Sequence, residues 1–585
     1  MLKVGLEGQP MVNTDDRYIA QLTMRKIQVV INDDGASQWE IWQAPLDEAS
    51  FLRVAVDHFA SADLLCWGVG NTKYWYRSDS VEDLDDGSEV FETVQEWMAY
   101  TTLRNLRKSG KDPLEIVCRR CHEREMDCYA SLRMNDGHFL FEDPPGQPRG
   151  PFEAFHPSQL WNHRRGPGES PLTPAFWREH PAFRIGEAWE GSPFAAHLFD
   201  YAHEEVRERQ LGIVRELAGA CDIDGIELDF MRSPYFFKPG QTETGKGHMN
   251  RLVREARGIL DEAGRAKGRG LGLCARCPTS LEGCARIGLD VETWVEEAWI
   301  DLLVPSPSRL NRFEIDLRPM VELARGRPCR VLLGMDTGLK ALSWEEVRAW
   351  KRRDEKEEDD SFAELREKRD GKLGVPEGIP IESWRALASN AYADGVDGIY
   401  LFNLWDQVAR HGRHADGAVL NDVRNDASLA EKDKLYALDF EASVSDHSSA
   451  HLGEKGSLPV VLKEGETNRL RMRIADDLSS VDARLILEVR LHLLFVHLTP
   501  LDRIRLEMNG EDLERFKHAP TLEAGAPAGP NAGFTDVVYL LEGRFPRAGG
   551  NEFALTLLEK NRNVRPAVYL RRFEMLVRYR GGVNP

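Results

Sequence analysis

Short apolar segments that alternate with helical stretches restrict the fold of this chain more than any other feature. Eight such segments occur within about the first 420 residues: 25–35, 61–70, 125–136, 222–230, 270–278, 298–306, 328–336 and 396–406. Repeated strand–helix units pair in parallel through right-handed crossovers, which leaves the helices outside the sheet. The pattern therefore predicts an α/β fold, a (β/α)8 TIM barrel whose reactive end lies at the carboxyl ends of the strands.

An open doubly wound sheet is the alternative arrangement of the same units. Such a sheet usually carries a glycine-rich phosphate-binding turn after its first strand. This chain has "NDDGAS" there, at residues 32–37, so we expect the barrel.

The other segments divide the chain into a barrel and a C-terminal domain. We expect the barrel over residues 1–425, with a lid-like insertion at 138–192, a long helix over 192–220 and a charged helical insertion at 340–376. Over residues 430–585, apolar and polar residues alternate between Gly and Asn turns, which is typical of an antiparallel β-sandwich. This domain could bind carbohydrate or only pack against the barrel, and we expect packing because no aromatic platform stands out in its sequence.

The charge of the chain restricts its partners. The 585 residues carry a formal net charge of −20, and an acidic surface repels phosphate, so neither nucleic acid nor an anionic membrane is expected as a partner. The longest apolar run, "LILEVRLHLLFVHL", is interrupted by charged residues and is too short to span a bilayer. The N-terminal "MLKVGLEGQPMVNTDD" lacks the apolar core of a signal peptide. We expect a cytoplasmic protein, although a secreted protein trimmed of its signal would read the same.

Nine cysteines, an odd number, suit reduced thiols. Two triplets share a C-x2-C-x6-C spacing: Cys118, Cys121 and Cys128, and Cys274, Cys277 and Cys284. No fourth thiol completes either set, although His122 could serve as a ligand, and Cys274 and Cys277 would point to opposite faces of a strand. We therefore expect buried core thiols, with no metal site and no cofactor.

The fourth apolar segment, "DIDGIELDF", carries two acids, Glu227 and Asp229. Side chains alternate along a strand, so the two acids share one face. Carboxylates this close repel each other, so one binds a proton near neutral pH, or a cation such as Arg232 keeps both ionised. A salt bridge that orders the mouth is the alternative. Acids at this end of barrel strands are typically functional, so we expect a catalytic role.

Polar side chains also follow the other predicted strands. They are Asp33 and Asp34 after the first, Arg133, Asn135, Asp136 and His138 after the third, Arg276 in the fifth, Asp336 after the seventh, and Asn403, Trp405 and Asp406 after the eighth. Because barrel strands end around one mouth, we expect these residues to surround one site. His138 can act as an acid or base near neutral pH, and Trp405 can stack on a sugar or cover the mouth. An Asp–Gly turn is the alternative reading of Asp33 and Asp34.

This set of acids, amides, one histidine and one tryptophan suits cleavage of a glycosidic bond. That reaction commonly uses two groups that flank an oxocarbenium-like centre. The sequence contains no metal-ligand spacing, phosphate-binding glycine loop or nucleophile elbow that would favour another chemistry. The expected partner is a carbohydrate or glycan substrate.

The strings "DGIELDFMR", "SLRMND" and "DGIYLFNLWD" resemble those of bacterial glycosidase-like barrel proteins, often described as family-10-like glycosyl hydrolases, over roughly residues 20–425. "DGIELDF" is also similar to the DGxDxDxE strand of chitinase-type barrels. Met231 stands where that strand has its final acid, which puts a substrate-assisted chitinase mechanism in doubt. The arrangement further resembles the inverting sialidases of environmental bacteria. This resemblance implies that Asp34, or Asp33, and His138 form the proton-transfer pair.

Three arginines, Arg133, Arg232 and Arg276, end the third, fourth and fifth strands, and a guanidinium group suits a substrate carboxylate. Counter-ions for the nearby acids are the alternative role. We therefore expect an exo-acting glycoside hydrolase of a terminal acidic sugar, with sialic acid as the leading substrate. In this hypothesis Glu227 and Asp229 orient the substrate or share the acid–base work.

Two other functions remain open from the sequence. One is a neutral-sugar glycosidase in which Glu227 or Asp229 acts with Asp336 or Asp406 opposite. The other is a non-catalytic carbohydrate-binding protein built on a decayed barrel. The oligomeric state is not determined by the sequence, and a homodimer is compatible with it.

Overall fold

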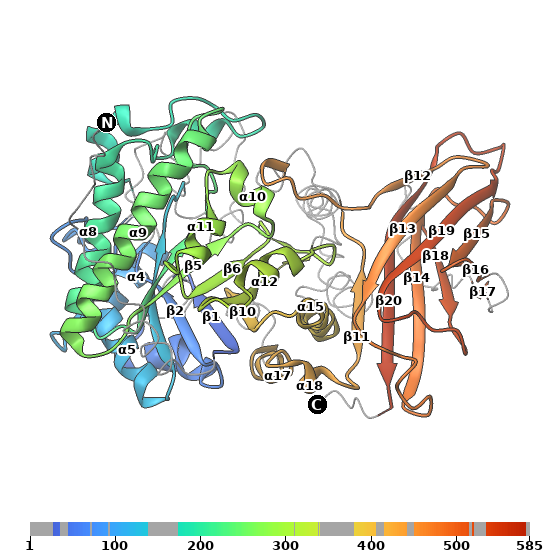
Figure 1. Cartoon of the computed structure of the whole chain (residues 1–585), viewed down its shortest axis with the longest axis horizontal. Helices are drawn as coiled ribbons and strands as arrows, with labels where there is room; N and C mark the ends of the chain where they lie inside the picture. Colours follow the sequence, from blue (N-terminus) through green and yellow to red (C-terminus); the bar gives the residue numbers. More distant parts are fainter. Residues whose placement is uncertain are drawn as a thin grey trace, which may run out of the picture.

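Figure 1 shows the computed structural model of the chain, a barrel of parallel strands beside two antiparallel sheets. The structure describes residues 27–35, 45–70, 73–91, 94–137, 173–308, 310–336, 338–339, 380–404, 415–440, 450–513, 518–519 and 534–580. His138, Trp405 and Asp406 lie outside the described residues, as do the charged insertion at 340–376 and residues 138–172 of the lid-like insertion. Among the described helices, none is long and apolar enough to cross a membrane.

Eight parallel strands close into a barrel, which confirms the fold expected from the strand–helix alternation. They are β1 (Val29–Asp33), β2 (Leu64–Gly68), β3 (Asp127–Arg133), β4 (Gly225–Asp229), β5 (Gly272–Cys277), β6 (Leu302–Pro305), β8 (Arg330–Met335) and β10 (Gly398–Phe402). Their order around the barrel is β1-β10-β8-β6-β5-β4-β3-β2. The register places Glu227 of β4 between Ser131 of β3 and Cys274 of β5.

Helices cover the outside of the barrel (Figure 1). Those described between barrel strands are α3 (Glu48–Ala55), α4 (Val94–Arg107), α5 (Pro113–Glu123), α7 (Ala175–Glu179), α8 (Glu204–Ala220), α9 (Thr242–Lys267), α10 (Leu281–Arg286), α11 (Val291–Glu296), α12 (Arg318–Ala324) and α15 (Ile381–Asp394). The helix expected over 192–220 begins only at Glu204. Pro193 opens a separate 3₁₀ turn, and His203, just before α8, has an extended backbone.

The long helix α9 shows why these segments are helical. Met249, Leu252, Ala256 and Leu260 recur at spacings of three and four residues and are all buried, so one face of the helix packs on the barrel. The helix ends at Gly268, whose φ of 70° is the left-handed conformation that glycine adopts without strain.

Inward-pointing side chains change from apolar to polar along the strands. The apolar cluster inside the barrel consists of Ile27, Val30, Leu64, Cys66, Tyr129, Cys274, Leu302, Val304, Leu332, Tyr400 and Phe402. Tyr129 lies against Gly225 and Gly272, where an added Cβ atom would overlap its ring or its hydroxyl group. Polar residues follow at the strand ends, for example Ser131 two residues after Tyr129 and Arg276 two residues after Cys274. Because the strands are parallel, the polar side chains all gather at one end of the barrel.

Two antiparallel sheets form the C-terminal part of the chain. One contains β11 (Lys434–Ala437), β12 (Val460–Leu462), β14 (Ile486–Val496), β17 (His518–Ala519), β18 (Phe534–Leu540) and β20 (Val568–Tyr579), and the other contains β13 (Thr467–Ile474), β15 (Arg503–Met508), β16 (Glu511–Asp512) and β19 (Gly549–Glu559). Alternate residues of β13, such as Leu470 and Met472, are buried, as the sequence pattern predicts. The rings of Phe553 on β19 and Phe573 on β20 lie 4.9 Å apart. The two sheets therefore contact each other through apolar side chains.

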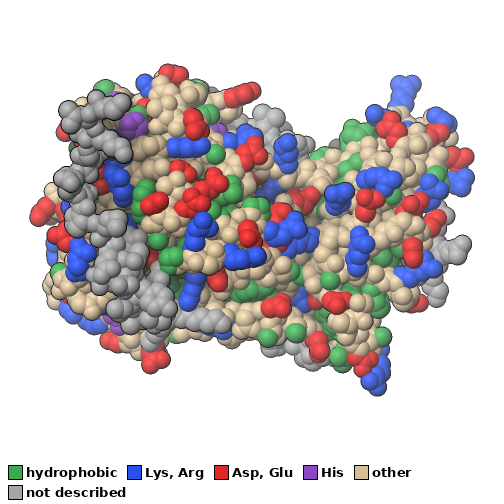
Figure 2. All heavy atoms as spheres, viewed as in Figure 1, with side chains coloured by type: hydrophobic (Ala, Val, Ile, Leu, Met, Phe, Trp, Pro, Cys, Tyr) green, Lys and Arg blue, Asp and Glu red, His purple; other side chains and the backbone are tan. Residues whose placement is uncertain are grey.

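Helix α15 lies between the barrel and these sheets (Figure 1). Its residues are buried almost all round, which is typical of a helix covered on two sides. At its end, Asp394 accepts a hydrogen bond of 2.6 Å from Arg473 of β13 and one of 3.1 Å from the backbone N–H of Leu317. On the face shown in Figure 2, acidic and basic side chains are interspersed, so the net charge is not gathered in one patch there.

Candidate active site

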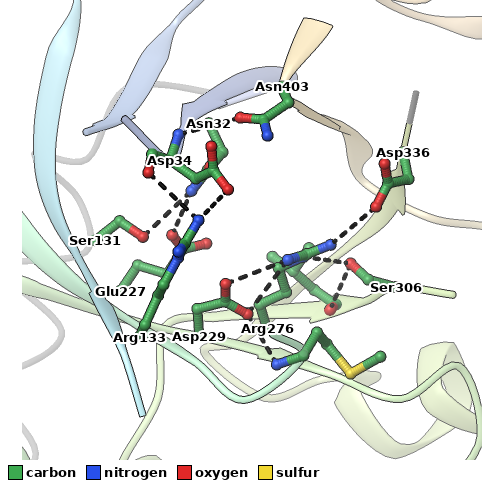
Figure 3. Close-up of polar contacts among 12 residues, drawn as sticks. Asn32, Asp34, Ser131, Arg133, Glu227, Asp229, Arg276, Ser306, Asp336 and Asn403 are labelled. Atoms are coloured by element: carbon green, nitrogen blue, oxygen red, sulfur yellow. Dashed lines mark hydrogen bonds and ion pairs between the residues drawn. The ribbon is translucent and has the colours of Figure 1, made fainter. Parts of the chain in front are cut away.

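Polar inward side chains form a cluster at the carboxyl ends of the barrel strands (Figure 3). The members are Asn32 and Asp34 of β1 and the residue after it, Ser131 and Arg133 of β3, Glu227 and Asp229 of β4, Arg276 of β5, Ser306 after β6, Asp336 after β8 and Asn403 after β10. Residues that are far apart in the chain thus surround one small region, as the barrel hypothesis requires.

Glu227 lies at the floor of this cluster. Its Oε2 atom accepts a hydrogen bond of 2.8 Å from Asn32 Nδ2, which also donates to Ser131 Oγ at 3.2 Å. The side chain is fully buried, and its Oε1 atom has no hydrogen-bond partner among the described residues. Burial, reinforced by the negative charge of Asp229, raises the pKa of Glu227 to about 7. This carboxyl group can therefore gain or lose a proton near neutral pH.

Arg276 lies between two acids on one side of the cluster. Its Nη1 atom donates to the two carboxylate oxygens of Asp229 at 3.3 and 3.2 Å, and its Nη2 atom lies 3.8 Å from Asp336 Oδ2. Its Nε atom donates to Ser306 Oγ at 3.1 Å. The guanidinium carbon lies 3.8 Å from the ring centroid of Phe402, close enough for a cation–π interaction. These contacts surround Arg276, and only 3% of its side chain is exposed.

Arg133 occupies the corresponding position on the other side (Figure 3). Its Nη1 atom donates to Asp136 Oδ2 at 2.6 Å, and its Nη2 atom donates to the carboxylate of Asp34. The backbone N–H of Asp34 donates to Asn403 Oδ1 at 3.2 Å. The Asp34 side chain is 12% exposed, as is that of Asp336, whereas Asp136 is 2% exposed. Asp34 and Asp336 are therefore the more accessible carboxylates of the cluster.

Two of the predicted substrate-binding residues bind the backbone. Asn135 Nδ2 donates to the carbonyl oxygens of Phe199 at 2.9 Å and Tyr235 at 2.8 Å, so this amide ties two loops together. Asp33 Oδ1 accepts a hydrogen bond of 3.0 Å from the N–H of Gly35, which is the Asp–Gly turn considered above. Asp33 is the neighbour of an inward-pointing residue on its strand, so its side chain points out of the barrel interior.

The remaining predicted residues divide into three groups. Asn403 lies in the cluster and has a φ of 48°, an unusual left-handed backbone for a residue other than glycine. Arg232 is half-buried beyond the end of β4, and its contact with a substrate carboxylate stays a prediction. His138, Trp405 and Asp406 cannot be placed, because they lie outside the described residues.

Sequence reasoning missed three members of the cluster, Asn32, Ser131 and Ser306. Each is a small polar residue near the end of a strand, and Asn32 and Ser131 stand two positions before the predicted Asp34 and Arg133. The signal that could have revealed them is this spacing, since residues two apart in a strand share a face.

The cysteines behave as core residues. Cys274 belongs to the apolar cluster inside the barrel and Cys277 to the core outside it, so they point to opposite faces of β5 as predicted. Cys118 and Cys128 are buried, with sulfur atoms 3.2 Å apart. Over the part of the chain that the structure describes, no group of three or more His, Cys, Asp or Glu side chains is arranged to hold a metal ion.

Comparisons with known proteins find structural likeness only. No protein-family model matches the chain, and no curated protein matches it. The solved structures that are similar include a family GH18 chitinase from Chromobacterium violaceum, at a TM-score of 0.33 and 10% identity over 93% of this chain and 91% of that one. The glycoside hydrolase domain of PgaB (BpsB) from Bordetella bronchiseptica has a TM-score of 0.34 and 12% identity over 68% of this chain and 99% of that one. A GH36 α-galactosidase from Geobacillus stearothermophilus has a TM-score of 0.30 and 11% identity over 91% of this chain and 55% of that one.

These three solved structures are glycoside hydrolases, and each is similar to this chain at low identity. A shared barrel does not define an activity, because unrelated reactions are carried by the same fold. The function therefore depends on the side chains of the cluster rather than on the fold.

Proposed function

We propose that this chain is a glycoside hydrolase whose reaction takes place at the mouth of the barrel. The observation that supports it is Glu227, a buried carboxyl group with a pKa of about 7 that lies between two arginine–carboxylate clusters. Cleavage of a glycosidic bond needs a proton donor for the leaving oxygen and a second group on the other side of the sugar carbon. Carboxyl groups in different protonation states supply both.

Each acid has a distinct role in this proposal. Glu227 carries the proton, and Asp34 or Asp336 activates water or attacks the sugar carbon. Asp34 and Asp336 suit this task because they are partly exposed and each faces a guanidinium group. Glu227 is the deepest of these acids, so it would meet only the end of a sugar chain that enters the mouth. This depth favours an exo-acting enzyme.

The charge balance supports a neutral sugar as the first substrate class to test. Arg276 contacts Asp229 and lies near Asp336, while Arg133 contacts Asp34 and Asp136. A substrate carboxylate would have to displace one of these acids or add to their negative charge. A neutral sugar needs neither change and can accept and donate hydrogen bonds among the same groups.

A terminal acidic sugar, with sialic acid as the leading example, is the second candidate. The observation that favours it is the presence of two buried guanidinium groups, Arg133 and Arg276, at the ends of strands that flank β4. Bidentate guanidinium groups are well suited to a carboxylate. In this version His138 and Asp34 form the proton-transfer pair, as the resemblance to inverting sialidases implies.

Turnover of a panel of aryl glycosides tests the proposal and separates the two substrate classes. The panel contains neutral aryl hexosides and an aryl sialoside, and the proteins are wild type, Glu227→Gln, Asp34→Asn and His138→Ala. Glu466→Gln serves as the control, because Glu466 is an exposed acid far along the chain whose ion pair with Lys463 is weak, at 3.6 Å. We expect a loss of kcat of about 100-fold or more in Glu227→Gln on neutral substrates and no change in the control.

Arg276→Lys discriminates further, because lysine keeps the charge and loses the planar pair of donors. A loss confined to the sialoside supports the acidic sugar, and a similar loss on all substrates supports the neutral one. Tight binding of sugars with no turnover on the whole panel contradicts hydrolysis and leaves the carbohydrate-binding alternative.

We also infer that the two C-terminal sheets pack face to face as a β-sandwich. The contact between Phe553 and Phe573 and the alternation of buried residues on β13 and β14 support this packing. Carbohydrate is the partner that the proposed activity requires, and neither nucleic acid nor a membrane is proposed.

A further inference from the structure

A segment of the C-terminal part of the chain lies on the mouth side of the barrel. We name residues 450–457 the clasp segment. The ring of His451 stacks on Tyr235, with centroids 4.4 Å apart and an interplanar angle of 18°, and meets the edge of Trp189 at 4.5 Å. Tyr235 follows β4, and its carbonyl oxygen is one of the two that accept a hydrogen bond from Asn135. The clasp segment is therefore packed against the loop that leaves the Glu227 strand.

Glu454 attaches the clasp segment to the chain that follows β6. Its Oε1 atom accepts a hydrogen bond of 3.0 Å from the backbone N–H of Ser308, and its Oε2 atom lies 3.7 Å from Arg312 Nη1. Arg312 also donates to the carbonyl oxygen of Lys455. The side chains of Glu454 and Arg312 are 5% and 3% exposed, so this attachment is shielded from water.

Residues 306–308 and 310–312, called segment 306–312 below, in turn hold two groups of the candidate site. Ser306 Oγ accepts the hydrogen bond from Arg276 Nε at 3.1 Å. Asn311 accepts a hydrogen bond of 2.8 Å from the backbone N–H of Asp336 and donates to the carbonyl oxygen of the same residue. The segment 306–312 thus touches Arg276 on one side and Asp336 on the other.

We propose that Glu454, which lies outside the barrel in sequence, is a positioning residue that fixes segment 306–312 and through it Arg276 and Asp336. Ser308 is buried, so its N–H needs an acceptor, and Glu454 provides it. Its charge opposite Arg312 holds the same segment from a second point. The effect on catalysis rests on the proposed function, whereas the effect on the segment does not.

Two variants of Glu454 separate its two contacts. Glu454→Gln keeps an acceptor for Ser308 and loses the charge that faces Arg312, and Glu454→Ala loses both. Arg473→Met is the matched control. It breaks an ion pair across the same boundary between barrel and sheets, at the end of α15, which precedes the amino end of β10. All three are compared with wild type on the neutral aryl glycoside that wild type turns over fastest.

We expect kcat to fall about 10- to 100-fold in Glu454→Ala with a small change in KM, and to fall less in Glu454→Gln, because misplaced groups lower the rate of the chemical step. Arg473→Met should lower the melting temperature and leave kcat unchanged. Equal losses of kcat in Glu454→Ala and Arg473→Met would mean that general docking of the sheets, and not Glu454, supports the site, and would overturn the proposal.

Amide hydrogen exchange gives a readout that needs no activity. We expect faster exchange in peptides covering residues 306–312 of Glu454→Ala, with exchange around Glu227 on β4 unchanged. Unaltered exchange over 306–312 would overturn the proposal whatever the activity. If wild type turns over no substrate, the proposed function fails, and faster exchange would still support the positioning of the segment.

Discussion

Arg276 illustrates how a single buried charge is retained in this protein. Its guanidinium group is enclosed by Asp229, Ser306 and the ring of Phe402, and almost none of it reaches water. A buried ion pair adds little net stability compared with apolar residues, since both charges lose their hydration. Removing one partner is costly because the other charge is left in a poorly hydrated place. The pair is therefore better explained by the placement of Asp229 than by a gain in stability.

Breaking this pair should destabilise the protein strongly. We expect Arg276→Met to lower the free energy of unfolding by about 3–5 kcal/mol, because Asp229 is left buried without its counter-ion. The double variant Arg276→Met/Asp229→Asn should recover part of the loss. Urea unfolding followed by tryptophan fluorescence measures both. Arg286→Met, which breaks the exposed ion pair with Glu282, should change stability by less than about 1 kcal/mol, and a loss as large as that of Arg276→Met would contradict this reasoning.

Glu227 should make stability fall with rising pH. In the folded protein its pKa is about 7, above the ordinary value of 4.5, so the unfolded chain loses this proton first as the pH rises. Stability contributed by the neutral carboxyl group is therefore full below pH 4.5 and decreases up to about pH 7. Between pH 4.5 and 7.5, wild type should lose about 3 kcal/mol relative to Glu227→Gln, which does not titrate. Urea unfolding of both proteins at the two pH values tests this, and an unchanged difference would show that Glu227 ionises normally.

At the scale of elements, β3, β4 and β5 fit together through residues of very different size. The ring of Tyr129 on β3 occupies the space beside Gly225 of β4 and Gly272 of β5; Gly225 pairs with Tyr129 in the barrel register, and Gly272 pairs with Gly225. A larger residue at either position would meet Tyr129. Tyrosine on one strand and glycines on the next two strands thus fill the interior together, as close packing requires.

Gly272→Ala should therefore be destabilising by about 1–3 kcal/mol, because the new methyl group overlaps the Tyr129 hydroxyl group. Gly258→Ala, on the exposed face of α9 with nothing within 4 Å of the added Cβ atom, should be neutral or stabilising by up to about 1 kcal/mol. Thermal unfolding of both variants provides the measurement. Combining Gly272→Ala with Tyr129→Phe should recover part of the stability, because the hydroxyl oxygen is the nearest overlapping atom and the ring carbon Cζ remains at 2.6 Å. A double variant no better than the single one would place the cause elsewhere.

The elements also show what the sequence could predict. Alternating apolar strands and helices were sufficient for the barrel, because periodicity depends on local residue pattern. The short parallel pair β7 (Leu310–Asn311) and β9 (Gly338–Leu339) was not predicted, since two-residue strands have no periodic signal. In the site, Arg133 and Glu227 were predicted because they are charged residues near the carboxyl ends of predicted barrel strands. Ser306 was missed because its role depends on Arg276, a partner 30 residues away.

Two contacts between the barrel and the sheets also could not be predicted from the sequence. The pairing of Glu454 with Ser308 and of Asp394 with Arg473 joins residues 146 and 79 positions apart. No local sequence pattern predicts such pairs, because they form only when the barrel and the sheets pack against each other. The C-terminal sheets contact the barrel part through α15, and whether packing is their only role stays a prediction.

At the scale of the whole molecule, the barrel and the C-terminal sheets share α15 as a common element. Arg385 of this helix donates to Asp422 at 2.7 Å and to the carbonyl oxygen of Asp433 at 3.3 Å, just before β11. Asp439, after β11, accepts hydrogen bonds from the backbone N–H groups of Phe313 at 2.9 Å and Glu314 at 2.7 Å. Neither part can lose its structure without exposing buried polar groups of the other.

The two parts should therefore unfold together. We expect one calorimetric transition for the full chain, with a calorimetric enthalpy equal to the van't Hoff enthalpy. Arg473→Met should move this single transition to lower temperature without splitting it, because its partner Asp394 belongs to the shared helix. Two resolved transitions in wild type would show that the sheets are an independent domain held by weak contacts.

The apolar filling beneath Glu227 has one more consequence. Tyr129, Leu332 and their neighbours fill the barrel interior on that side, so we expect protons to pass between Glu227 and bulk water through the polar end of the barrel. A sugar bound at this end of the barrel would block proton exchange between Glu227 and bulk water. In the proposed reaction Glu227 would then have to bind its proton before the sugar enters, so an acidification after binding would not change the outcome of that cycle.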